Sequence, residues 1–208
     1  MKKNIALLGL CLFVFSAVAD PYDVPQVVAL ENRLYNVKYD LTPHLGFYPM
    51  DAFNKSVVFG LSFTNFFESY KGWEIINFHY AKNIETNLKS QLLENFNVRP
   101  TGILDYIEWV ALSSYVYTPF YSKNLAFNQK VVHGDISFVG GPGLVGFQSG
   151  EKAITAGGGL ILRFFWTEKY SVKLDARTYY HMGKDKNTNF LLMTTAGLSI
   201  QLGGSEKK

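Results

Sequence analysis

The chain has 208 residues, of which 48% are hydrophobic and 16% aromatic, and its formal net charge is +3. This length suits one domain, and so balanced a charge gives no sign of a nucleic-acid partner. The single cysteine lies in the N-terminal apolar run, so we expect no disulfide, thiolate metal site or cysteine nucleophile in the rest of the chain. Abundant glycine and aromatic residues favour closely packed strands with aromatic girdles.

The first 19 residues have the pattern of a secretory signal peptide. Two lysines precede an apolar run over 5–18, and Ala17-Val18-Ala19 forms a small-x-small cleavage signal. The apolar run is too short to anchor the protein in a membrane. Its removal together with the two lysines would lower the formal net charge of +3 by two, to +1. No later stretch approaches the roughly 18 uninterrupted apolar residues that a spanning helix needs.

Eight windows along the rest of the chain alternate between apolar and polar residues. They are 37–48, 56–66, 73–81, 106–120, 131–139, 155–165, 170–180 and 190–202. Eight such windows, with turn signals between them, predict an all-β fold in which eight antiparallel strands form a closed up-and-down barrel. The window 106–120 is partly apolar on both faces, so its orientation stays open. We therefore expect a signal peptide (1–19), a periplasmic N-terminal segment (20–36), an outer-membrane barrel (37–202) and a polar C-terminal tail (203–208).

The window 170–180 shows the alternation most clearly. One face is apolar with a tyrosine at each end, and the other carries Lys173, Asp175 and Arg177. A strand of a soluble sandwich also alternates. Lipid outside, a polar lumen inside and aromatic residues at the headgroup level are typical of a transmembrane strand. Because seven other windows share this rhythm, we interpret the chain as a membrane barrel.

The connections between the windows indicate an orientation. Those after the second, fourth and sixth windows are short to moderate, whereas Gly140–Lys152 and His181–Asn189, after odd windows, are longer. Bacterial outer-membrane barrels have short periplasmic turns and long outer loops, and an even strand number leaves both termini in the periplasm. We therefore expect the protein in the outer membrane of a Gram-negative cell, with membrane lipid as a partner.

Two further features predict a contact with a second copy of the chain. The connection after the third window predicts a helix over Ile84–Phe96, which ends at Arg99-Pro100. Its apolar stripe consists of Ile84, Leu88, Leu92 and Phe96. Such a stripe must be buried against lipid, the barrel rim or a neighbouring subunit, and a helix folded onto its own barrel explains it equally well. The run Gly157, Gly158 and Gly159 lacks the signature of a phosphate loop and marks a thin-walled strand where barrel curvature or another subunit approaches closely.

The two-residue repeat of the strands places ten ionisable side chains on the inner face of the predicted barrel. They are Lys38, Asp40, His44, His79, His133, Asp135, Arg163, Lys173, Asp175 and Arg177. Eight strands enclose an interior just wide enough for side chains, so we expect a paired network of charges. A closed plug is the favoured interpretation, and a gate that passes small ions is the alternative.

A catalytic interpretation rests on His133, Asp135 and Ser137, which share a face. Lipid-modifying barrels use a serine and a histidine with an acidic partner. Residues two apart on a strand face, however, lie about 7 Å apart, which strains direct hydrogen bonding. We therefore expect no catalytic residue, cofactor or metal site, and keep a lipid-modifying enzyme as the less favoured alternative.

Three short blocks resemble an outer-membrane β-barrel family of myxobacteria and predatory deltaproteobacteria. They are Glu31-Asn32-Arg33-Leu34-Tyr35, Gly46-Phe47-Tyr48-Pro49-Met50-Asp51-Ala52-Phe53 and Trp73-Glu74-Ile75. The resemblance is specific from Leu30 to about Pro100, and beyond that only the strand rhythm carries it. Similar proteins include OmpA-like eight-stranded barrels and PopA-type barrels that form rings around lipid. The resemblance thus implies a structural or porin-like barrel that forms a homo-oligomer.

Overall fold

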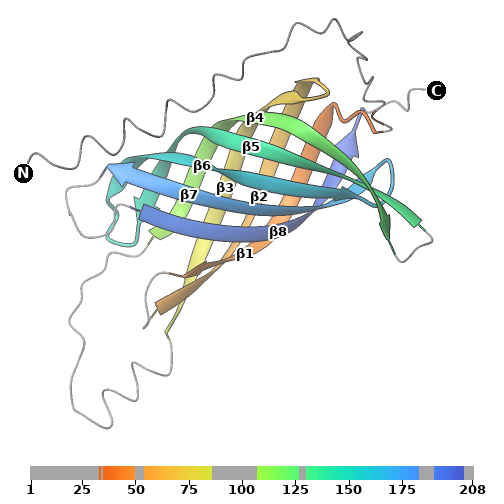
Figure 1. Cartoon of the computed structure of the whole chain (residues 1–208). Helices are drawn as coiled ribbons and strands as arrows, with labels where there is room; N and C mark the ends of the chain where they lie inside the picture. The colour runs from red at the N-terminus through yellow and green to blue at the C-terminus, as the bar shows by residue number, and fades with distance from the viewer. Residues whose placement is uncertain are drawn as a thin grey trace, which may run out of the picture. The chain divides into compact units, whose positions relative to one another are not determined.

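Eight antiparallel strands form one closed barrel in the computed structural model (Figure 1). The structure describes residues 33, 35–49, 54–85, 107–126, 130–182 and 190–203. The strands are β1 (Tyr39–Pro49), β2 (Asn54–Glu68), β3 (Lys71–Glu85), β4 (Ile107–Ala126), β5 (Lys130–Phe147), β6 (Lys152–Phe165), β7 (Tyr170–Met182) and β8 (Phe190–Leu202). Each strand pairs with its sequence neighbour, and β8 closes the barrel on β1. The predicted all-β barrel is confirmed, and no described residue belongs to a helix able to cross a membrane.

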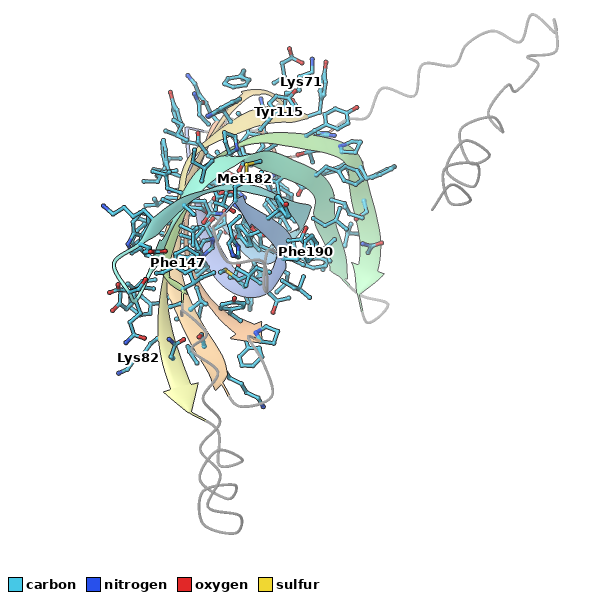
Figure 2. All side chains as sticks on the ribbon, turned by 90° about the vertical axis from the view of Figure 1, so that its left-hand side faces the viewer. Lys71, Lys82, Tyr115, Phe147, Met182 and Phe190 are labelled. Carbon is cyan, nitrogen blue, oxygen red and sulfur yellow. The ribbon has the colours of Figure 1, made fainter. Side chains whose placement is uncertain are left out.

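The two-residue repeat gives the wall two different faces (Figure 2). On β7, Ser171, Lys173 and Arg177 are buried inside, whereas Tyr170 and Leu174 are exposed outside. Because successive side chains of a strand point to opposite faces, each strand contributes to both surfaces. The structure also decides the orientation of β4, which the sequence left open. It buries Val110, Leu112, Ser114, Val116 and Thr118, and exposes Tyr115 and Tyr117.

The wall of β3 is irregular at Ile75 and Ile76, which are both exposed, at 50% and 47%. Phe63 of β2 pairs with Ile76, but the next residue, Thr64, pairs with Glu74. The extra residue in β3 forms a β-bulge. The residues of β3 before the bulge therefore point to the opposite face from the one that a regular strand would give them. Glu74 therefore points into the barrel, where it is fully buried.

The predicted loop Gly140–Lys152 is wrong for most of its length. Residues 140–147 extend β5, β6 begins at Lys152, and only a turn over 148–151 joins them. Its glycines at 140, 141, 143 and 146 lie in the wall of β5, and a Cβ at Gly141 would lie 2.1 Å from the carbonyl oxygen of Ser113 on β4. Gly150 lies in the turn. The turn after β5 is thus as tight as the turn after β6. It therefore gives no support to the expected orientation, in which the connections after odd strands are long outer loops.

The predicted helix over Ile84–Phe96 is wrong at its start. Ile84 lies in β3 and is 51% exposed, because the alternation of this strand continues to Glu85. Leu88, Leu92 and Phe96 lie outside the described residues.

Candidate functional site

The interior of the barrel is the candidate functional site, and it is bounded by two apolar clusters. We call the end where β1 begins and β8 ends the terminal end, and the opposite end the loop end. The terminal-end cluster contains Val37, Phe66, Val116, Val139, Ile161 and Phe165, with Tyr35 and Tyr121 packed against it. The loop-end cluster contains Tyr48, Val58, Ala81, Ile107, Val110, Leu112, Val145, Tyr179, Leu191 and Met193. Between these clusters, buried polar side chains form three groups.

The first group centres on Arg163 and lies next to the terminal-end cluster. The Nε and Nη2 atoms of Arg163 donate to Asp135 at 3.1 and 2.7 Å, and its Nη1 donates to Asp40 at 3.1 Å. The other oxygen of Asp40 accepts hydrogen bonds from Thr42 at 2.7 Å and from Ser199 at 2.6 Å. One guanidinium thus joins β1, β5 and β6 across the interior, and charge-assisted bonds of this kind are the strong ones.

The second group centres on Arg177, deeper in the barrel. Its Nε donates to both carboxylate oxygens of Asp175 at 2.8 Å, and its Nη2 donates to Glu74 at 2.7 Å. Gly159 on β6 is opposite Arg177, and a Cβ there would lie 2.7 Å from the Cα of Arg177. The backbone of β6 therefore needs a glycine at this position. Lys173 lies on the same inner face of β7 and donates from Nζ to Ser62 at 3.5 Å.

The third group is a hydrogen-bonded pair of histidines beside the loop-end cluster. His44 Nδ1 lies 3.2 Å from the carbonyl oxygen of Thr42, and its Nε2 lies 2.9 Å from His79 Nδ1. The carbonyl can only accept, so His44 carries a proton on Nδ1. The hydroxyl of Tyr179 lies 3.3 Å from His79 Nε2 and 3.9 Å from Met193 Sδ. Both ring nitrogens of each histidine thus have a polar partner.

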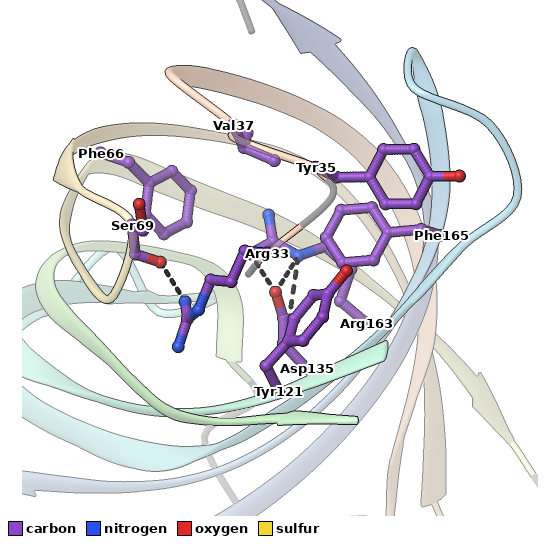
Figure 3. A pocket seen from close by; sticks show the side chains of 9 residues that line it. All are labelled: Arg33, Tyr35, Val37, Phe66, Ser69, Tyr121, Asp135, Arg163 and Phe165. Carbon is purple, nitrogen blue, oxygen red and sulfur yellow. Dashed lines mark hydrogen bonds and ion pairs between the residues drawn. The ribbon is translucent and has the colours of Figure 1, made fainter. Parts of the chain in front are cut away.

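Arg33, Tyr35 and Val37 lie at the terminal end (Figure 3). Arg33 donates to the carbonyl oxygens of Ser69 and Thr118, the latter at 3.0 Å. The ring of Tyr35 stacks on Phe165 with centroids 5.1 Å apart. Arg33 and Tyr35 thus help to close the barrel mouth.

Eight of the ten predicted inner side chains lie in the interior, and two do not. Lys38 is exposed because β1 begins only at Tyr39, so the alternation of the strand does not extend to residue 38. Its Nζ lies 5.5 Å from the centroid of the Tyr39 ring. His133 is half-buried at the mouth, where its ring contacts Tyr35 at 5.4 Å and Tyr121 at 5.9 Å. The two-residue repeat did not predict that Glu74 points inward. The two adjacent isoleucines after it interrupt the alternation and indicate the bulge.

The structure does not assemble His133, Asp135 and Ser137 into one unit. Asp135 is bonded to Arg163, and Ser137 is bonded to Thr118 at 2.8 Å. Within the described ranges, no group of three or more His, Cys, Asp and Glu side chains is placed to hold a metal ion.

The three glycines of β6 do not share a face, which corrects the proposed subunit contact. A Cβ at Gly157 would meet Leu112 at 2.6 Å inside the barrel, and Gly159 also faces inward. A Cβ at Gly158 would point outward, and its nearest neighbour would be a carbonyl oxygen at 3.6 Å. Of the three, only Gly158 is available to an outside partner.

No family model and no curated protein sequence matches this chain. Among solved structures, the chain is similar to the solution structure of the de novo designed protein TMB2.3, with a TM-score of 0.36, 9% sequence identity, and coverage of 81% of this chain and 97% of that chain. It is also similar to the crystal structure of a major outer membrane protein from Thermus thermophilus, with a TM-score of 0.41, 9% identity, and coverage of 81% and 100%.

Proposed function

We propose that the protein is a transmembrane barrel of the bacterial outer membrane with a structural role and a closed interior. The observation that carries this proposal is a continuous outer face of exposed large apolar side chains around a polar interior. One example from each strand in order is Leu45, Phe59, Phe78, Tyr117, Phe138, Leu162, Leu174 and Leu198. Water-soluble monomers rarely expose so extended an apolar surface, and a closed barrel leaves no backbone edge unpaired in lipid.

The filled interior favours a structural role over that of an open pore. Apolar clusters occupy both ends, and Arg163 and Arg177 are each held by two carboxylates between them. Conduction would require several of these bonds to break together. A gated channel for small ions is the second candidate, because a rearrangement of Arg177 between Glu74 and Asp175 would not need the wall to open.

Membrane fractionation and gel migration test the location. We expect the mature protein in the outer-membrane fraction, with faster migration before boiling than after it, because a closed ladder without edges resists detergent. Recovery in the soluble periplasm with migration that is independent of heating would refute the proposal.

Planar bilayers and lipid analysis separate the candidate functions. A structural barrel gives no steady conductance, whereas a gated channel gives discrete openings that increase when Asp175→Ala frees Arg177. A lipid-modifying enzyme would alter phospholipid or lipopolysaccharide and lose that activity in His133→Ala. A large, ungated conductance of the wild type would overturn the closed interior.

We further propose that the barrel forms a homo-oligomer through the outer face around Gly158. Association in lipid depends on close fit at small residues, and Gly140, which pairs with Gly158, extends the small surface. Gly158→Trp should give folded monomers, because the outer side of this position is open, whereas Gly158→Ala should keep the oligomer. Cross-linking in membranes and mass measurement in mild detergent provide the readout, and an unchanged mass for Gly158→Trp would place the contact elsewhere.

A further inference from the structure

His44 and His79 come from different strands and meet inside the barrel across β2. His44 of β1 and His79 of β3 both pair with Gly60 of β2, one from each side. A Cβ at Gly60 would lie 2.5 Å from His44 Nε2, so the missing side chain leaves the space in which the two rings meet. The ring centroids are 4.7 Å apart, and both residues are buried. The contact therefore links two strands that are not neighbours in the wall.

The facing nitrogen atoms limit the number of protons that the pair can hold. His44 Nε2 lies 2.9 Å from His79 Nδ1, and a hydrogen bond between them needs a proton on one atom and a lone pair on the other. The intact pair is therefore either two neutral rings or one charged and one neutral ring. Two charged rings would place two N–H groups against each other, which this distance does not allow.

The surroundings of the pair make a second charge still less favourable. The charged side chains that act on the pair come from β7 and are Lys173, Asp175 and Arg177. On β2, β4 and β8, the described partners of the two histidines are uncharged and are Gly60, Val110 and Gly197. Both Asp175 and Glu74 of β3 are bonded to Arg177. A second positive charge on the pair would thus meet two cations, and the nearby carboxylates already bind one of them.

We propose that His44 and His79 form an acid-sensitive lock between β1 and β3. While at most one ring is charged, the pair joins these strands and reaches Tyr179 of β7. When both rings are charged, the hydrogen bond between them is lost and the rings repel each other. Because interacting groups titrate as a unit, the lock opens when the pair takes up its second proton. The interior beside the loop-end cluster then loosens at acidic pH.

Acid should destabilise the folded barrel through this pair. In the unfolded chain, both histidines titrate near about pH 6.5, so they bind two more protons than neutral rings at clearly lower pH. The folded pair binds at most one more while its hydrogen bond persists. Because the unfolded state binds more protons, stability falls as the pH falls. Each unit of pH below this range should lower the ratio of folded to unfolded protein at least about tenfold, and about a hundredfold if the folded pair stays neutral.

Urea unfolding of the full mature chain in detergent, between about pH 8 and about pH 5, tests the proposal above the usual range of the carboxylates. His44→Gln and His79→Gln should each weaken the dependence on pH, because the remaining histidine can be charged without facing a second charged ring. His133→Gln is the control, because His133 lies at the mouth, and it should keep most of the wild-type dependence. A full wild-type dependence in His44→Gln and His79→Gln would overturn the lock.

Nitrogen NMR of the folded wild type gives a second readout if the glutamine variants do not fold. In protein with isotopically labelled histidine, the hydrogen bond should give a scalar coupling between two imidazole nitrogens at neutral pH. This coupling should disappear at the pH where the nitrogen shifts report that both rings are charged. The absence of the coupling at neutral pH, or its persistence when both rings are charged, would overturn the proposal. Both measurements use the solubilised barrel, so their results are independent of the cellular location and the structural role proposed above.

Discussion

Arg177→Met should be one of the most destabilising single changes in the barrel. The side chain is 2% exposed and bonds two carboxylates, Glu74 at 0% and Asp175 at 9% exposure. At least three charge-assisted hydrogen bonds are lost, each worth about 1.5–3 kcal/mol. Since contacts within one cluster are not additive, we expect a total near the value for breaking a buried ion pair, about 3–5 kcal/mol.

Urea unfolding in detergent, followed by gel migration without boiling, measures this loss. Lys71→Met is the matched control, because Lys71 forms an exposed ion pair with Glu68 at 3.4 Å, and we expect little change from its loss. Replacing Arg177, Glu74 and Asp175 together by apolar residues should regain most of the stability, since a buried ionic network contributes little beyond a well-packed apolar one. Equal and small shifts for Arg177→Met and Lys71→Met would refute this reasoning.

Three further predictions concern the wall and the mouth of the barrel. Leu174→Arg should lower the free energy of folding into vesicles by about 2–4 kcal/mol if the position lies near the bilayer midplane, whereas Leu174→Ala should cost less; equal costs would contradict a lipid-facing position. Gly159→Ala should reduce the yield of heat-modifiable barrel, because its Cβ would lie 2.1 Å from a carbonyl oxygen of β7, while Gly158→Ala should fold normally; equal yields would contradict the assigned faces. Tyr35→Ala should lower the thermal midpoint, because the stacking on Phe165 is worth about 0.5–1.5 kcal/mol beyond burial; an unchanged midpoint would mean that the mouth contact adds no stability.

The two-residue period predicted the barrel because every strand separates an apolar from a polar surface. It placed Asp40, Asp135 and Arg163 on the inner face, and the structure joins them in one group. Parity holds only within a regular strand, however. It therefore misplaced Lys38, which precedes β1, and it missed Glu74, whose direction a bulge reverses.

Glycine carried the most ambiguous signal. The run around Gly141 resembles a loop in composition, yet it is strand, because a curved wall with bulky side chains inside needs positions without a Cβ. The partners of each charge were likewise beyond the sequence, since Arg163 and Asp40 are 123 residues apart. Which inner side chains meet depends on the tilt and stagger of the strands, and these follow from closure of the whole barrel.

The bonds of Asp40 have a consequence for how the protein folds. Asp40 lies near the beginning of the barrel sequence, and Ser199, which donates to it, lies near the end, 159 residues later. Contacts between such distant residues form late, since the long intervening loop must first lose its conformational freedom. A chain lacking β8 would therefore leave Asp40 without one of its partners and β1 without its last neighbour. We expect folding to be limited by this final joining of the two ends, so that Ser199→Ala slows barrel formation in a refolding time course.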